Sequence, residues 1–165
     1  METFDSYEAI VQFGILKERQ ANRFYLAMAQ RVADAGIRGL FEELAVEELE
    51  HRANLELELM KMGIVVDTTA DTEEIDSSDY VISDSPQLDM DLRDVLELAV
   101  AKEDAAFRLY IDMAGKAENQ ESKDVLAAMA QEEARHKMRF EAERDKLNRE
   151  ERQAGPEPGH CAEGL

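Results

Sequence analysis

Hydrophobic side chains recur every three or four residues over four long stretches, the spacing of one face of an α-helix. The pattern predicts helices over about residues 6–33, 37–61, 89–117 and 122–151. Asp5 or Ser6 suits the N-cap of the first helix, and Gly63 suits the end of the second. The apolar positions expected on the inner faces of the first two helices are Ile10, Phe13, Ile15, Leu16, Phe24, Leu26, Met28, Leu40, Phe41, Leu44, Leu55 and Leu59.

The connections between these helices set the expected topology. "ADAGIRG" and "GKAENQE" are short, so each joins two neighbouring antiparallel helices. Residues 63–86 are rich in Asp, Ser and Thr and are long enough to run from one end of a bundle to the other. The expected fold is all-α: one four-helix bundle over residues 1–151, made of two helical hairpins joined by this crossover. Residues 152–165 are rich in Pro and Gly and are expected to form a flexible tail.

The two halves of the chain repeat at an offset of 85 residues. "LKERQANRFYLAMA" (16–29) aligns with "AKEDAAFRLYIDMA" (101–114), and "AVEELEHR" (45–52) aligns with "AQEEARHK" (130–137). The aligned identities include Glu18 with Glu103, Tyr25 with Tyr110, Glu48 with Glu133, and His51 with His136. A Glu-x-x-His pair therefore occurs twice in one register, which argues against a chance origin.

The Glu-x-x-His spacing suits metal ligands on a helix. Residues three apart project from one face, so Glu48 and His51 can bind one ion, or Glu48 can bridge two. Glu133 and His136 can do the same from the fourth helix. The remaining acidic candidates, which lie within otherwise apolar stretches of the first and third helices, are Glu18 and Glu103.

Four carboxylates and two imidazoles would thus converge from four helices, the donor set of di-iron and di-manganese bundles. Two divalent cations would neutralise the carboxylates, whose burial alone is very unfavourable. Oxygen and imidazole ligands suit iron or manganese, and zinc can occupy such sites too. Without metal, we expect raised carboxylate pKa values and lower stability.

Other polar positions carry weaker signals. Tyr25 and Tyr110 either hydrogen-bond ligand carboxylates or bound oxygen species, or are ordinary core tyrosines. The repeated Glu47 and Glu132 are expected to be outer-face charges, because adjacent helical residues point about 100° apart. The tail residues His160 and Cys161 are expected in a disordered end rather than a metal site.

Composition excludes several classes of function. The net charge of −19 argues against nucleic-acid binding and against an anionic membrane surface, while an acidic shell attracts cations. A single cysteine excludes an internal disulfide and cysteine-based zinc or iron sites. No stretch approaches the roughly 20 apolar residues of a membrane span. No secretory signal is visible at the start of the chain, so the expected location is the cytoplasm.

The segments "LKERQANRFY", "EELEH", "AKEDAAFRLY" and "EEARH" resemble the ferritin-like superfamily, and within it the rubrerythrin-type diiron domain. The resemblance covers about residues 5–150 and implies bridging roles for Glu48 and Glu133. It implies that Glu18 and Glu103 are terminal ligands, and that His51 and His136 complete the two sites. Two departures concern activity. The rubredoxin domain of rubrerythrins proper, with its paired Cys-x-x-Cys motifs, is lacking, and Ala106 stands where they carry an extra glutamate.

Three functions follow as hypotheses. The favoured one is an oxidoreductase that reduces peroxide or dioxygen at a di-iron centre with electrons from a separate donor protein. The second is a ferroxidase-like protein that binds, oxidises and passes on or stores iron. The third is a structural bundle that holds zinc or another redox-silent metal. A homodimer is expected from the resemblance, and the long crossover would allow hairpins to swap between chains.

Overall fold

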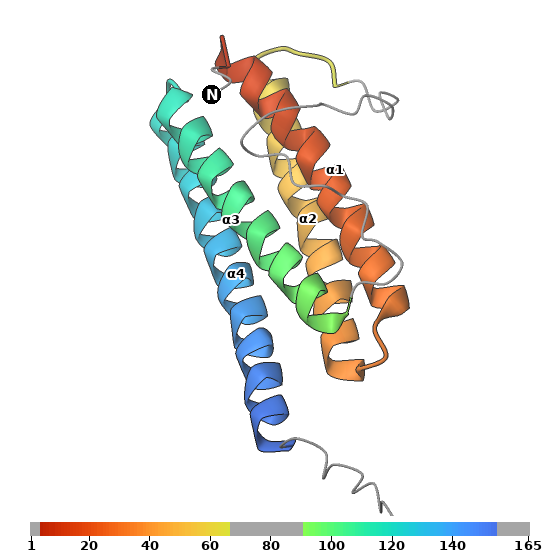
Figure 1. The fold of residues 1–165 in the computed structure, drawn as a ribbon. Coiled ribbons are helices and arrows are strands. Elements are labelled where there is room, and N and C mark those ends of the chain that lie inside the picture. The colour runs from red at the N-terminus through yellow and green to blue at the C-terminus, as the bar shows by residue number, and fades with distance from the viewer. Residues whose placement is uncertain (1–3, 67–90, 155–165) are drawn as a thin grey trace, which may run out of the picture.

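The computed structural model describes residues 4–66 and 91–154, and within them it contains four α-helices and no strands. The helices are α1 (Tyr7–Arg31), α2 (Ala35–Lys61), α3 (Leu92–Lys116) and α4 (Gln120–Ala154). α1 pairs with α2 and α3 with α4, and the two hairpins meet along α1–α3 and α2–α4 (Figure 1). The end of α2 and the start of α3 lie at opposite ends of the bundle (Figure 1). This arrangement confirms the predicted all-α, ferritin-like four-helix bundle of two hairpins.

Short polar side chains start three of the helices. The side chains of Ser6, Asp34 and Asp91 accept hydrogen bonds from the backbone N–H groups of Ala9, Ile37 and Asp94, respectively. Each bond satisfies one of the N–H groups that the first helical turn leaves without a partner. Ser6 is therefore the N-cap of α1, as one of the two predicted candidates.

The end of α2 follows from Gly63, as predicted. Gly63 has a φ of 76°, a conformation that other L-residues rarely adopt. Its N–H bonds the carbonyl of Met60, and the N–H of Ile64 bonds that of Leu59, which satisfies two carbonyls of the last turn. The other bounds lie within a few residues of the predictions, and α4 runs past Glu151 to Ala154. Most of the predicted crossover (67–86) and tail (155–165), including His160 and Cys161, lies outside the described residues.

Two apolar clusters fill the bundle, one toward each end. The first joins the start of α1 to the end of α2, the end of α3 and the start of α4, with Phe13, Leu55 and Met113 among its members. The second joins the opposite ends of the same helices, with Phe24, Phe41 and Phe140. The polar positions predicted as ligands lie between the two clusters along every helix.

Two of the positions predicted for the inner face do not lie in the core. Leu26 is 46% exposed and Leu16 is only half-buried, whereas the other predicted positions are all buried. Leu26 is two residues from both Phe24 and Met28, which face the core. Two helical residues turn the side chain by about 200°, so Leu26 points to the outside of α1.

Candidate metal centre

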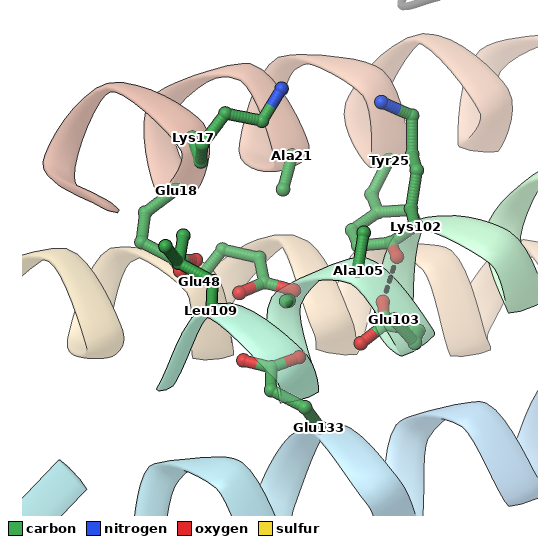
Figure 2. Close-up of a pocket in the computed structure, with 11 residues that line it drawn as sticks. Lys17, Glu18, Ala21, Tyr25, Glu48, Lys102, Glu103, Ala105, Leu109 and Glu133 are labelled. Carbon is green, nitrogen blue, oxygen red and sulfur yellow. Dashed lines mark hydrogen bonds between the residues drawn. The ribbon is translucent and has the colours of Figure 1, made fainter. Parts of the chain in front are cut away.

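The six predicted ligands form one buried polar layer in the middle of the bundle. Each helix contributes, and Figure 2 shows the four carboxylates pointing toward one another between the helices. None of the six is more than 3% exposed: they are Glu18, Glu48, His51, Glu103, Glu133 and His136. Such burial without compensation is rare for charged residues, so the layer demands a physical explanation.

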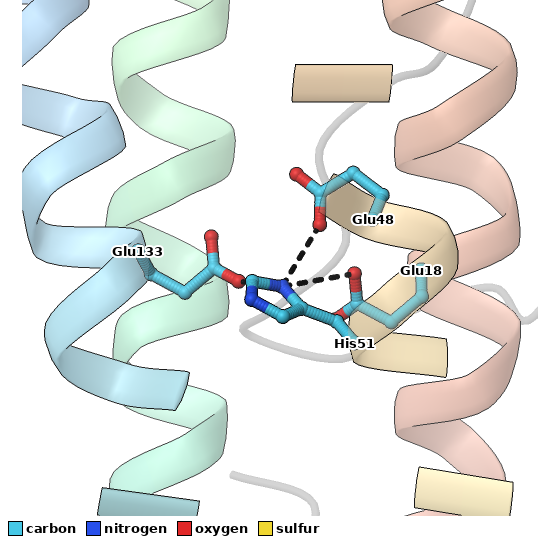
Figure 3. A group of neighbouring side chains, drawn as sticks. All are labelled: Glu18, Glu48, His51 and Glu133. Carbon is cyan, nitrogen blue, oxygen red and sulfur yellow. Dashed lines mark hydrogen bonds and ion pairs between the residues drawn. The ribbon is translucent and has the colours of Figure 1, made fainter. Parts of the chain in front are cut away.

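The first half of the layer surrounds His51. Its Nδ1 lies 2.7 Å from Glu133 Oε1, 3.2 Å from Glu48 Oε2 and 4.0 Å from Glu18 Oε2 (Figure 3). One donor atom from each of these four residues lies within 4.8 Å of all the others. The four atoms come from α1, α2 and α4, and together they could hold one metal ion.

The second half surrounds His136 in the same way. Its Nδ1 lies 3.4 Å from Glu103 Oε2 and 3.5 Å from Glu133 Oε2. The donor atoms of Glu48, Glu103, Glu133 and His136 form a second group within the same 4.8 Å limit. Glu48 and Glu133 belong to both groups. The two candidate metal positions therefore share two carboxylates, each of which could bridge them.

Burial and mutual repulsion raise the pKa of two carboxyl groups well above the usual range. Desolvation has the largest effect on the pKa of both Glu18 and Glu103. The charge of Glu48 adds to the rise for Glu18, and that of Glu133 adds to the rise for Glu103. This agrees with the raised carboxylate pKa expected for a metal-free site.

Glu133 departs from that expectation. Its burial also favours the neutral form, but the close contacts with the imidazoles of His136 and His51 outweigh burial and hold its pKa below the usual range. The same contacts act on the histidines in the opposite direction. Burial lowers the pKa of each imidazole, but the surrounding carboxylates outweigh it and raise the pKa of His51 to about 12 and of His136 to about 11.

The donor set fits two divalent cations. Among the described residues, the buried atoms Glu103 Oε2, both carboxylate oxygens of Glu133 and His136 Nδ1 have no well-aligned hydrogen-bond partner. Buried polar atoms without partners cost free energy, and metal coordination would satisfy them. Two divalent ions would also balance four carboxylates beside two neutral imidazoles. The buried carboxylates and imidazoles of the layer could therefore bind a pair of metal ions.

Glu47 and Glu132 do more than the sequence predicted. They are only partly exposed, and each contacts a histidine of the other hairpin rather than forming an outer-face charge alone. Glu132 Oε2 lies 2.9 Å from His51 Nε2, and Glu47 Oε2 lies 2.5 Å from His136 Nε2. A carboxylate on Nε2 fixes the ring so that Nδ1 faces the candidate metal position. Their shared offset of 85 was the sequence signal for this pairing.

The structure places both tyrosines against predicted ligands. Tyr25 Oη donates to Glu103 Oε1, and Tyr110 Oη donates to Glu18 Oε1, so these bonds also cross between the hairpins. Both side chains are completely buried. Of the two sequence interpretations, the hydrogen bond to a carboxylate is the one observed. Contact with bound oxygen species stays a prediction.

A small cavity lies over the carboxylates between α1 and α3. Its volume is about 30 Å³, which gives room for roughly two water-sized molecules. Figure 2 shows Lys17 and Lys102 above the carboxylate layer, with Ala21 and Ala105 beside them. Burial lowers the pKa of Lys17, and burial together with the charge of Lys17 lowers the pKa of Lys102 to about 7.

None of the described helices has the length and apolarity that a membrane crossing requires.

The first prediction concerns pH and metal. Without metal, Glu18, Glu103 and both histidines hold protons in the folded chain at pH values where the unfolded chain has lost them. Each raised pKa adds stability that is complete below the unfolded value and is lost as pH rises toward the folded value. Thermal unfolding of the metal-free protein should therefore occur at lower temperature at about pH 8.5 than at about pH 6.

The metal-loaded protein should show the opposite trend. Metal binding needs deprotonated ligands and releases protons, so its contribution to stability grows with pH. Calorimetry at both pH values gives the change of unfolding temperature with pH, once with excess Mn²⁺ and once with chelator. A Glu18→Gln/Glu103→Gln variant is the control. The pH dependence of its unfolding temperature should differ much less between the samples with metal and with chelator. Equal slopes with metal and with chelator would refute the dimetal interpretation.

The second prediction concerns Glu132. Glu132→Gln replaces the carboxylate at His51 Nε2 with a weaker partner and should lower the affinity for one of two Mn²⁺ ions by about 10- to 100-fold. A Mn²⁺ titration measures both affinities, with the free Mn²⁺ determined from its electron paramagnetic resonance spectrum. Glu50→Gln, an exposed change on α2, is the matched control. If the two variants bind Mn²⁺ equally, Glu132 does not orient a ligand.

Comparison with known proteins agrees with this arrangement. The model of the protein family described as Rubrerythrin matches residues 9–144, with a second match over 94–159. No curated protein matches the chain. Among solved structures, a dodecameric thioferritin of Bacteroides fragilis, a bacterioferritin-related protein, superposes with a TM-score of 0.75 at 18% identity, covering 89% of each chain.

A hypothetical protein from Pyrococcus furiosus has a TM-score of 0.72 at 21% identity, covering 88% of this chain and 92% of its own. A conserved hypothetical protein from Mycobacterium tuberculosis has a TM-score of 0.62 at 16% identity, covering 85% of this chain and 98% of its own. These likenesses establish the fold. The family match extends over most of the described chain, so the protein belongs to the rubrerythrin family of the ferritin-like superfamily.

Proposed function

We propose that the protein is a non-haem di-iron oxidoreductase of rubrerythrin type, which reduces peroxide or dioxygen with electrons from a separate donor protein. The observation that carries the proposal is the pair of donor groups that share Glu48 and Glu133. Shared carboxylates hold two ions close enough to act on one small oxidant. Glu18 with His51, and Glu103 with His136, would complete the two metal positions.

Iron is the proposed metal because the donor set combines oxygen and imidazole ligands, although manganese and zinc accept the same set. When bound, the iron pair would supply Lewis acidity and one electron from each ion. Reduction of hydrogen peroxide to two water molecules needs two electrons and two protons, so a separate donor must restore the reduced state. A rubredoxin domain would need paired cysteines, and the chain has a single cysteine.

The residues around the carboxylate layer would hold the centre in position. Tyr25 and Tyr110 donate to the two terminal carboxylates and so limit their rotation. Glu132 and Glu47 orient the two imidazoles. Apolar side chains pack on both sides of the carboxylate layer, and the small cavity between α1 and α3 lies beside the carboxylates.

The iron-handling alternative rests on different observations. A net charge of −19 favours the approach of cations, and the fold resembles that of a bacterioferritin-related thioferritin. In that case Fe²⁺ is the substrate, and each turnover consumes iron rather than an electron donor. The third candidate function is a structural bundle with a redox-silent zinc site. The experiment below distinguishes it from the other two.

We propose a cytoplasmic location and an assembly of identical chains, with a homodimer as the smallest form. The thioferritin of Bacteroides fragilis is dodecameric, which supports self-assembly within this fold. The exposed apolar side chains along α2, Val46, Leu49, Leu57 and Met60, offer a surface for such contacts.

The third prediction separates the proposed functions. Protein carrying two irons per chain is mixed with excess hydrogen peroxide and a small-molecule reductant, and peroxide and ferric iron are both followed. Sustained loss of peroxide far beyond the iron present, with no ferric product beyond the bound pair, is the expected result. Glu133→Gln should slow this loss by at least about 100-fold, while the exposed change Glu42→Gln should not. Ferric iron that accumulates beyond two per chain would instead establish iron handling, and tight binding of zinc alone would establish the structural role.

A further inference from the structure

Gly14 is a buried glycine of α1, and it lies where α1 contacts both α2 and α3. A β-carbon at this position would lie 2.3 Å from Met113 Cε on α3 and 2.9 Å from Leu55 Cδ1 on α2. Carbon atoms that are not bonded to each other pack at about 3.5–4.0 Å, so a side chain here would force both neighbours to move. Glycine weakens the middle of a helix, and this close contact supplies the physical reason for one in α1.

Each residue of this contact lies one helical turn from a group in the His51 half of the polar layer. The pairs are Gly14 with Glu18, Leu55 with His51, and Met113 with Tyr110. Residues three or four apart lie on the same face of a helix, one above the other. The contact at Gly14 therefore forms the apolar packing next to the predicted ligands of α1 and α2.

The three polar groups beside this contact also touch one another. Tyr110 Oη donates to Glu18 Oε1, and the rings of Tyr110 and His51 meet edge to face with their centres 5.9 Å apart. Glu18 Oε2 lies 4.0 Å from His51 Nδ1 (Figure 3). A change in the approach of α1 to α2 and α3 at Gly14 would thus move Glu18 relative to His51. Metal–ligand distances tolerate only about 0.2 Å of change, so such a movement would weaken binding.

The other half of the layer is packed with different side chains. The three equivalent positions of the repeat are buried as well: they are Ala99 for Gly14, Phe140 for Leu55, and Met28 for Met113. Ala99 carries a β-carbon, so the packing next to Glu103 accommodates the group that the packing next to Glu18 excludes. Of the two donor groups among the described residues, Glu18 belongs to the one around His51. An effect at Gly14 should therefore reach one metal position and spare the other.

We propose that Gly14 is a positioning residue for the metal position at His51. Its lack of a side chain sets how closely α1 approaches α2 and α3, and so where Glu18 lies. Gly14 acts through Glu18, whose carboxylate accepts the hydrogen bond from Tyr110. The inference rests on the proposed dimetal centre and makes its two metal positions unequal: one depends on the packing at Gly14, and the other does not.

The experiment, our fourth prediction, compares Gly14→Ala with Gly39→Ala. Gly39 is an exposed glycine of α2, and a β-carbon there would meet no described atom within 4 Å. Mn²⁺ is titrated into each variant, and the free ion is determined from its electron paramagnetic resonance spectrum. We expect Gly14→Ala to bind one of two Mn²⁺ ions about tenfold more weakly and the other with unchanged affinity. Gly39→Ala should match the unmodified protein for both ions.

Two further variants separate positioning from general stability. Gly14→Ala/Met113→Ala removes the nearest obstructing atoms and should recover most of the lost Mn²⁺ affinity. Met113→Ala alone leaves a cavity and lowers the unfolding temperature, yet it should keep both Mn²⁺ affinities. If Met113→Ala weakened one ion as much as Gly14→Ala does, a general loss of stability would explain both results and the proposal would fail. Affinity in the double variant that stays as weak as in Gly14→Ala would also contradict it.

The outcomes separate this inference from the proposed function. Two Mn²⁺ per chain with equal affinities in Gly14→Ala and Gly39→Ala would overturn the positioning role and leave the dimetal centre intact. Equal weakening of both ions would overturn it too, because Glu18 belongs to one donor group. Failure of the unmodified protein to bind Mn²⁺ would refute the centre and the inference together.

A fallback covers the case in which Gly14→Ala does not fold. Gly14→Ala/Met113→Ala is then compared with Met113→Ala. The double variant should still bind one Mn²⁺ ion more weakly, because Leu55 Cδ1 lies 2.9 Å from the position of the new β-carbon. Equal affinities in these two variants would count against the proposal.

Discussion

The burial of four carboxylates in the middle of a helical bundle is the constraint on which the rest of the structure depends. Each ionised group loses several kcal/mol of hydration when it leaves water, and neighbouring like charges add to that cost. In the described residues, Glu18 and Glu103 respond with strongly raised pKa values, and the two histidines respond by holding protons. Two divalent cations would resolve the same conflict without those protons. The polar layer is thus an unfavourable arrangement that bound metal would make favourable, and it lies between the two apolar clusters.

The bonds around this layer cross between the two hairpins. His51 on α2 contacts Glu132 on α4, and His136 on α4 contacts Glu47 on α2. The tyrosines follow the same rule between α1 and α3. Neither hairpin holds a complete donor group by itself. Docking of the two hairpins is therefore required to complete either donor group.

The sequence predicted which six polar side chains meet in the buried layer because their spacing along single helices and their repetition at one offset can be read directly from the sequence. Helix caps such as Ser6 and the stop at Gly63 can be read in the same way. The contacts of Glu47 and Glu132 could not be predicted from one helix. A side chain that does not point to the centre of the bundle can still meet a neighbouring helix. The same limit left the two interpretations of Tyr25 and Tyr110 open. Leu26 shows the converse error, since a hydrophobic residue inside an apolar stretch need not lie on its inner face.

We infer that Glu48 and Glu133 would hold two metal ions jointly rather than in separate sites. Electron paramagnetic resonance of protein loaded with two Mn²⁺ per chain tests it most directly, because shared carboxylates couple the two spins. We expect the multi-line spectrum of an exchange-coupled Mn²⁺ pair, and we expect the Glu133→Gln variant to lose it. A spectrum of isolated Mn²⁺ ions at full loading, or binding that stops at one ion per chain, would contradict it.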